Sequence, residues 1–105
     1  MLTAVYGIFT YDITDPEGYA AYSPGSLPII AATMAKHGGE VLFADSAARF
    51  EAGDKKAVVV GVKFPSDEDL HAWLADPEYA DAVAIRIATT DNLTMFMADA
   101  IEHGG

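Results

Sequence analysis

The sequence contains no cysteine, and it has only six basic residues against sixteen acidic ones. Without cysteine the chain forms no disulfide and no zinc–thiolate site, and it has no thiol nucleophile. Its formal charge of −10 repels phosphate backbones and anionic membrane surfaces, and no cluster of lysines and arginines offsets that charge. We therefore expect neither a nucleic acid nor a membrane among its partners.

Long apolar runs are also missing. No stretch reaches the ~18 residues that a membrane-spanning helix needs. The N-terminal segment lacks the charged region of a signal peptide and reaches an acidic residue, Asp12, too early for one. Together with the lack of cysteine, these absences predict a cytoplasmic protein.

The chain does have enough apolar residues for one core. Of its 105 residues, 51% are hydrophobic and 21% are charged, a balance typical of a globular protein and not of a disordered chain. A chain of this length forms one domain and buries about two-thirds of the surface that its unfolded form exposes. We predict a single domain over residues 1–98, followed by a flexible C-terminal tail at 99–105.

The elements alternate in a regular order. β-Branched and aromatic residues predict strands at 2–11, 40–45, 57–64 and 92–98. Helical spacing of apolar residues follows Asp15, Ser26, Ser66 and Asp76. The order is β-α-β-β-α-β, which predicts the ferredoxin-like arrangement of the α+β class, an antiparallel sheet with helices on one face.

The tripeptide Asp-Pro-Glu occurs twice, at residues 15–17 and 76–78. In each copy Asp can cap free amide groups, Pro suits the first helical turn, and Glu complements the positive end of the helix dipole. Both copies therefore predict helix starts. The stretch Ser23–Ser26 interrupts the first helix, and it fits either a pocket lid or a helix kink.

The predicted strands are apolar on both sides. In the strand at 57–64, Val58, Val60 and Val62 lie on one face, while Val59 and Gly61 lie on the other. A sheet with one face in water should alternate apolar and polar residues, so the second face must also be covered. We predict a homodimer formed by sheet-to-sheet packing.

Several segments together resemble the family called domain of unknown function 1330. They are "DPEGYAAY", "HGGEVL", "FEAGD", "VVVGVKFPS" and "AWLADPEY", followed by Arg86. The resemblance implies a dimeric α/β barrel, in which two ferredoxin-like sheets pack face to face. That superfamily includes cofactor-free monooxygenases acting on polyketide-like aromatics, lactone isomerases, haem enzymes and non-catalytic binding modules.

Three residues are candidates for catalysis. Arg86 can bind a carboxylate or enolate through its guanidinium fork, or else it forms an internal ion pair or lies along the helix edge. His37 can act as a general base, or it caps a helix C-terminus before two glycines. Tyr22 can donate a proton.

Further aromatic residues are candidates for ligand binding. Tyr6, Tyr19, Trp73 and Tyr79 can line a pocket for an aromatic molecule, although aromatics at helical or strand spacing also build ordinary cores. The three histidines show no ligand spacing, so we predict no metal and no cofactor.

Two functional hypotheses remain open. In the first, the protein is a homodimeric small-molecule-binding protein that does cofactor-free acid–base or oxygen chemistry on a small anionic or aromatic metabolite. In the second, it is a non-catalytic dimer that binds a metabolite or serves as an interaction scaffold. A pocket in which Arg86, His37 and a tyrosine converge would favour the enzyme.

Overall fold

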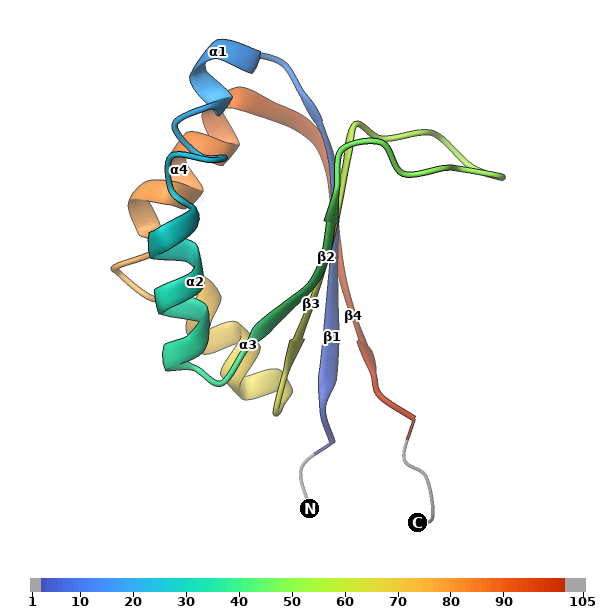
Figure 1. The fold of residues 1–105 in the computed structure, drawn as a ribbon. Helices are drawn as coiled ribbons and strands as arrows, with labels where there is room; N and C mark the ends of the chain where they lie inside the picture. The colour runs from blue at the N-terminus through green and yellow to red at the C-terminus, as the bar shows by residue number, and fades with distance from the viewer. Residues whose placement is uncertain (1–2, 102–105) are drawn as a thin grey trace.

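The computed structural model describes residues 3–101. Four strands form one antiparallel sheet in the order β2-β3-β1-β4: β1 (Val5–Ile13), β2 (Glu40–Asp45), β3 (Val58–Phe64) and β4 (Thr90–Asp99). The helices all lie on one face of that sheet (Figure 1): α1 (Pro16–Tyr19), α2 (Leu27–Lys36), α3 (Asp67–Leu74) and α4 (Ala80–Thr89). The predicted ferredoxin-like order is confirmed. Over residues 3–101, no helix is long and apolar enough to cross a membrane.

The ends of β1 and of its edge neighbour β4 differ from the sequence prediction. β1 runs to Ile13, and β4 begins at Thr90, directly after α4. Ile13 pairs with Thr90, and this backbone pairing extends both strands beyond their predicted ends. At the C-terminus, β4 includes Asp99, while residues 102–105 of the expected tail and Leu2 of the first strand lie outside the described residues.

Most of the predicted helix boundaries are confirmed. The Asp15 carboxylate accepts from the Gly18 amide at 3.1 Å, and Pro16 opens α1. The Ser66 hydroxyl accepts from the Asp69 amide at 3.1 Å at the start of α3. Gly38 ends α2 with φ +78°, a left-handed conformation that glycine adopts without steric cost.

The second Asp-Pro-Glu copy does not start a helix where the sequence predicted. α4 begins at Ala80, and residues 77–79 form a turn in which an Asp76 oxygen accepts from the Glu78 amide at 2.9 Å. The other Asp76 oxygen contacts Lys36 and His37. Because its carboxylate is bound to α2, Asp76 fixes a tertiary contact as well as a local turn.

The core lies between the helices and the covered face of the sheet, and Trp73 is at its centre. Its ring stacks on Tyr79 at 4.4 Å and on Phe64 at 5.5 Å between centroids. Its indole N–H donates to the Thr33 hydroxyl at 3.1 Å, so the buried donor is satisfied. Gly7 faces the same core, where an added Cβ would lie only 3.0 Å from Leu70.

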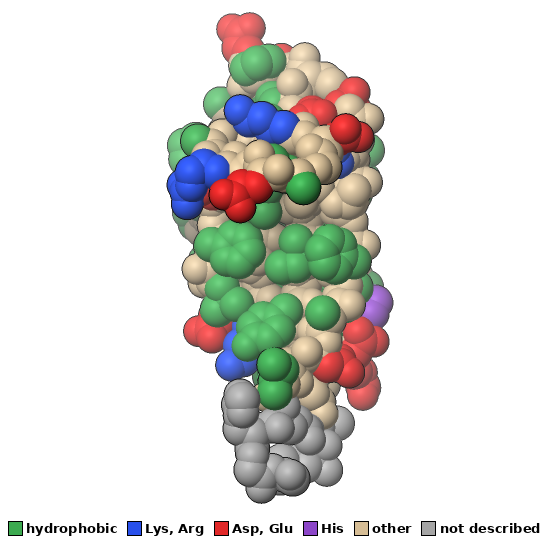
Figure 2. Space-filling view, turned by 90° about the vertical axis from the view of Figure 1, so that its right-hand side faces the viewer, with side chains coloured by type: hydrophobic (Ala, Val, Ile, Leu, Met, Phe, Trp, Pro, Cys, Tyr) green, Lys and Arg blue, Asp and Glu red, His purple; other side chains and the backbone are tan. Residues whose placement is uncertain are grey.

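The opposite face of the sheet carries no helix, and we call it the open face. One row of residues crosses all four strands there: Phe43 pairs with Gly61, Gly61 with Ile8, and Ile8 with Phe96. The Phe43 ring lies over Gly61, where an added Cβ would approach it to 2.3 Å. Figure 2 shows hydrophobic side chains gathered across the middle of this face. Phe43 is 45% exposed and Phe96 53%.

Candidate functional site

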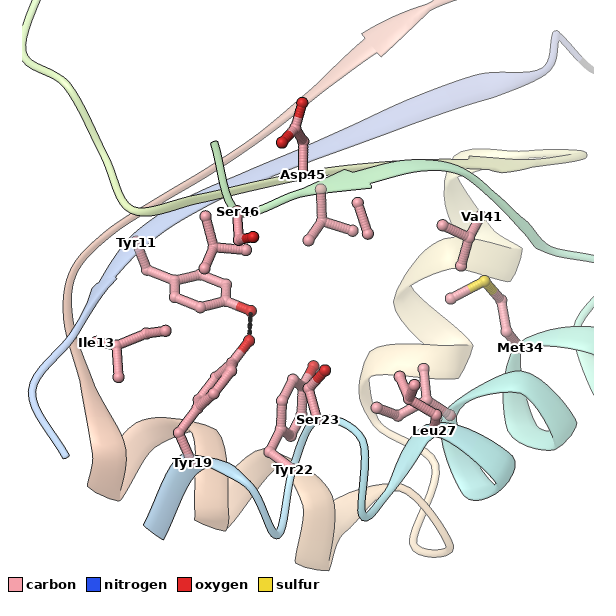
Figure 3. A pocket seen from close by; sticks show the side chains of 14 residues that line it. Tyr11, Ile13, Tyr19, Tyr22, Ser23, Leu27, Met34, Val41, Asp45 and Ser46 are labelled. Atoms are coloured by element: carbon pink, nitrogen blue, oxygen red, sulfur yellow. Dashed lines mark hydrogen bonds between the residues drawn. The ribbon is translucent and has the colours of Figure 1, made fainter. Parts of the chain in front are cut away.

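A cavity of about 300 Å³ lies between the covered face of the sheet and the segment from α1 to α2. Its walls are mainly apolar, with hydroxyl groups concentrated at one end (Figure 3). The lining residues are Tyr11, Ile13, Tyr19, Tyr22, Ser23, Leu27, Ile30, Met34, Val41, Ala44, Asp45, Ser46, Val58 and Val60. An apolar cleft with a few polar groups at one place is the usual form of a small-molecule site.

Two tyrosines from different elements meet at the polar end of the cavity. Tyr11 lies on β1, Tyr19 is the last residue of α1, and their hydroxyl oxygens are 2.7 Å apart (Figure 3). The Asp15 cap and Pro16 fix the start of α1 and thereby the position of Tyr19. Since one hydroxyl donates to the other, the pair retains one O–H that can donate to a ligand.

Both phenols of this pair remain neutral at physiological pH. Burial, together with the hydrogen bond to Tyr19, raises the pKa of Tyr11 well above its usual value. Burial also raises the pKa of Tyr19, while the hydrogen bond from Tyr11 and the charge of Arg86 oppose that rise. The polar end of the cavity therefore presents hydrogen-bond donors and no phenolate.

A second pair of tyrosines connects the cavity to a buried charge. The Tyr22 hydroxyl lines the cavity and lies 3.3 Å from the Tyr79 hydroxyl, and the Arg86 charge lies close enough to act on Tyr79. Burial raises the pKa of Tyr79, and the Arg86 charge opposes this rise. When Tyr79 is the donor of this bond, the Tyr22 O–H is available to a ligand in the cavity.

Arg86 itself is buried on α4, with only 5% of its surface exposed. Among residues 3–101 no carboxylate lies within ion-pair distance of its guanidinium, so neither the internal ion pair nor the exposed helix-edge position is found. An unpaired buried cation is costly unless a counter-charge or hydrogen bonds compensate it. The site therefore has a positive charge behind its hydroxyl groups, with Tyr79 between Arg86 and Tyr22.

His37 lies apart from this cavity, at the C-terminal end of α2. Its Nε2 is 2.8 Å from the Asp76 carboxylate, which also lies 2.8 Å from the Lys36 ammonium group. Hydrogen bonds from Lys36 and His37 hold the pKa of Asp76 well below its usual range. The structure thus places His37 in a polar contact between α2 and the α3–α4 turn, and it does not bring His37 together with Arg86 and Tyr22.

The remaining predicted ligand-binding residues fall in three places. Tyr19 lines the cavity, while Trp73 and Tyr79 are core residues with 3% and 2% of their surface exposed. Tyr6 lies on the open face beside Lys63, outside the cavity. Sequence reasoning missed Tyr11. Tyr11 shares a face of β1 with Val5, Gly7 and Phe9, so it could have been selected once that face was known to be the one the helices cover.

The described part of the chain also shows what the cavity lacks. No histidine, lysine or glutamate lines it, and its one carboxylate, Asp45, points away from the other lining side chains (Figure 3). Within residues 3–101, no three His, Asp or Glu side chains gather in a way that could hold a metal ion. The arrangement supports binding and hydrogen-bond donation at the tyrosine end.

Comparison with known protein families identifies the family of this chain. The family model called Domain of unknown function (DUF1330) matches residues 4–100. This chain belongs to the DUF1330 family. No curated protein matches the DUF1330 chain in sequence.

Solved structures show the same fold at low sequence identity. The RPA0582 protein of unknown function from Rhodopseudomonas palustris has a TM-score of 0.77 and 17% identity, covering 97% of this chain and 85% of that one. A dimeric ferredoxin-like protein of unknown function from Jannaschia sp. gives 0.70 and 15%, covering 94% and 99%. SnoaB, a cofactor-independent oxygenase from Streptomyces nogalater, gives 0.63 and 14%, covering 97% of each chain. These likenesses establish the fold of this DUF1330 protein.

Proposed function

We propose that this protein is a homodimer that binds a small aromatic molecule as its anion, with the acidic oxygen of the ligand at the tyrosine end of the cavity. The observation that carries the proposal is the buried Arg86 with no carboxylate partner in the described chain, close to Tyr79, whose hydroxyl lies 3.3 Å from that of Tyr22 at the cavity. A phenolate or enolate bound there would supply the missing negative charge.

The apolar walls support an aromatic ligand. Ile30, Met34, Val41 and Val60 line the part of the cavity away from the tyrosines. A volume of about 300 Å³ lies at the small end of the range for small-molecule sites. The favoured ligand is therefore compact, apolar over most of its surface, and acidic at one oxygen.

The chemistry we propose is acid–base or oxygen chemistry without a resident cofactor. Neutral phenols that donate to a developing oxyanion stabilise enolate-like states, and a positive charge behind them strengthens that effect in a dry site. Arg86 and Tyr22 would orient the anion, and Tyr19 would donate to it. The fold likeness to a cofactor-independent oxygenase agrees with this proposal as an analogy of fold alone.

A second candidate, a non-catalytic metabolite-binding dimer, is favoured by one observation. No histidine or lysine lines the cavity in the described chain, and the single carboxylate is turned away, so no general base faces a ligand there. Both candidates share the anion site and differ only in turnover.

The dimer is proposed to form through the open face. The central row of that face is apolar, whereas Lys63 on one flanking row and Thr10 and Thr94 on the other are polar. An apolar centre with a polar rim is the usual pattern of a protein interface. Sedimentation that shows a monomer at micromolar concentration would remove this part of the proposal.

The ligand proposal is tested with named phenols. Thermal shifts and calorimetry with 4-nitrophenol, 1-naphthol and salicylate should show binding, since a ligand at a hundred times its Kd adds about 2.7 kcal/mol of stability. Tyr19→Phe should weaken binding, while the matched control Tyr6→Phe, on the open face, should leave it unchanged. Equal binding by both variants would place the ligand outside this cavity.

Turnover separates the two candidates. A ligand that binds is incubated with the protein in air, and mass spectrometry follows proton exchange in heavy water and the incorporation of labelled oxygen. Exchange or incorporation that depends on Arg86 supports the enzyme. Tight binding with neither change supports the metabolite-binding dimer.

A further inference from the structure

Residues 46–57, which connect β2 to β3, form a long projection that we call the arm. Hairpin connections usually contain two to five residues, so this one is unusually long. Figure 1 shows it extending from the open face, away from the helices. It contains Gly53 in a left-handed conformation, φ +82°, and no strand is assigned within it.

The base of the arm is fixed to the sheet. The Lys56 ammonium group donates to the Asn92 carbonyl at 2.8 Å. The Ala57 amide donates to the Asp12 carboxylate at 2.9 Å, and the Asn92 side chain donates to the same carboxylate at 3.0 Å. These bonds join the arm to β1 and β4, so they set the direction in which it projects.

The arm is less acidic than the rest of the molecule. It carries three of the six basic residues (Arg49, Lys55 and Lys56) and two acidic ones (Glu51 and Asp54), a net charge of +1 in a chain of net charge −10. Arg49 and Lys55 form no ion pair with any residue of the described part. The Phe50 side chain is 37% exposed. Arg49 is therefore available to pair with a carboxylate of a partner that lies close to the open face.

We propose that the arm clasps a second copy of this chain, with Arg49 paired to a carboxylate at an edge strand of the partner and Phe50 packed beside it. The inference rests on the proposed sheet-to-sheet dimer. Packed sheets lie about 10 Å apart, whereas half of the arm, extended at about 3.3 Å per residue, spans up to about 20 Å. The arm therefore reaches past the plane of the partner's sheet.

The charges fit either orientation of the two subunits. A two-fold axis between the sheets brings the arm to one edge strand or the other. β2 carries Glu40 and Asp45, and β4 carries Asp91 and Asp99. Each edge thus offers carboxylates to Arg49, in a protein whose net charge would otherwise oppose self-association.

The first test measures the Kd of the dimer by sedimentation over a dilution series. The double variant Arg49→Ala with Phe50→Ala should raise the Kd about tenfold or more. Arg49→Lys should retain most of the affinity. Ile87→Ala, which truncates a side chain that is 65% exposed on α4, is the matched control and should leave the Kd unchanged.

The outcomes separate this inference from the proposed dimer. A wild-type protein that is monomeric at micromolar concentration removes the dimer and the clasp together. A wild-type dimer whose Kd does not change in the double variant overturns the clasp and leaves the dimer intact. Salt should weaken the wild-type dimer more than the Arg49→Ala dimer, because screening acts on the proposed ion pair.

A second test locates the arm by cross-linking, which the cysteine-free sequence makes simple. A chain with Glu51→Cys, next to Phe50, is mixed with a chain carrying Leu93→Cys on β4, or with one carrying Leu42→Cys on β2, and treated with a short bismaleimide. Efficient cross-linking of one mixture supports the clasp and identifies the edge. Cross-linking of neither mixture, with the dimer intact, contradicts it.

Discussion

Among residues 3–101 two charged side chains, Asp76 and Arg86, are buried, and their surroundings differ. Asp76 contacts the Lys36 ammonium group and the His37 ring, both at 2.8 Å, and it also accepts from the Glu78 amide. Arg86 lies close enough to Tyr79 for its charge to act on that phenol, and it has no carboxylate within ion-pair distance in the described chain. The protein supplies the counter-charges of Asp76 itself, whereas the described chain provides no carboxylate for Arg86.

Under the proposed function, Asp76 is a structural charge and Arg86 is a ligand-binding one. A buried charge with partners holds elements in place, and removing a partner destabilises the fold. A buried charge without a partner beside an apolar cavity is typical of a binding site, where burial and charge are arranged for a ligand. Variants of the two residues should therefore affect different measurements.

The largest expected effect is on ligand affinity at Arg86. Arg86→Met should lower the affinity for a phenolate ligand about 100-fold, equivalent to about 2.7 kcal/mol, because the bound anion loses its counter-charge. Stability should stay the same or rise, since an apolar side chain of similar length removes an unpaired buried charge. Calorimetry and thermal melting measure the two effects, and a large loss of stability would indicate a structural role instead.

At Asp76 we expect the opposite pattern. Asp76→Asn should lower the thermal midpoint, because Lys36 and His37 lose their shared counter-charge, and phenolate affinity should not change. The pKa of Asp76 is lower in the folded state than in the unfolded state, so its contribution is present above about pH 4 and is lost as the pH falls further. Melting curves between pH 7 and pH 2 should show a smaller acid-induced loss in the variant.

A smaller effect is expected at Tyr22. Tyr22→Phe removes one hydroxyl at the cavity wall and should weaken phenolate binding about five- to tenfold, close to 1 kcal/mol for one hydrogen bond. Tyr6→Phe serves as the control. If the Tyr22→Phe variant binds as tightly as the wild type, the connection from Arg86 through Tyr79 does not reach the ligand.

The smallest effect should come from His37. His37→Gln retains hydrogen-bonding capacity toward Asp76 and should change phenolate affinity less than about twofold, with a modest decrease in the thermal midpoint. If the variant still binds the ligand but loses turnover, His37 becomes a candidate base again, even though it does not line the cavity.

The fold could be predicted because its signals are local and repeated. The apolar alternation of strands, the Asp15 and Ser66 caps and the Gly38 stop each act within a few residues. The start of α4 could not be predicted in this way. Asp76 is a residue type that often caps helices, but its carboxylate is bound by Lys36 and His37, which are distant in sequence.

The candidate site was only partly predictable, for a similar reason. Tyr19, Tyr22 and Arg86 were selected from the sequence, and the structure places all three at or behind the tyrosine end of the cavity. Tyr11 was missed because both faces of β1 are apolar, so its pattern does not show which face the helices cover. His37 was selected because an imidazole can act as a general base, but the sequence alone does not show whether that side chain faces the cavity.

The central claim is that Arg86 makes this cavity an anion site, and the most direct test is a spectrophotometric pH titration of bound 4-nitrophenol. An unpaired buried cation should lower the pKa of the bound phenol by about one unit or more in the wild type, so the phenolate absorbance appears at lower pH than in buffer. In the Arg86→Met variant the pKa should return to the value in buffer or rise above it. An unchanged or raised pKa in the wild type, or the same shift in both proteins, would contradict the account.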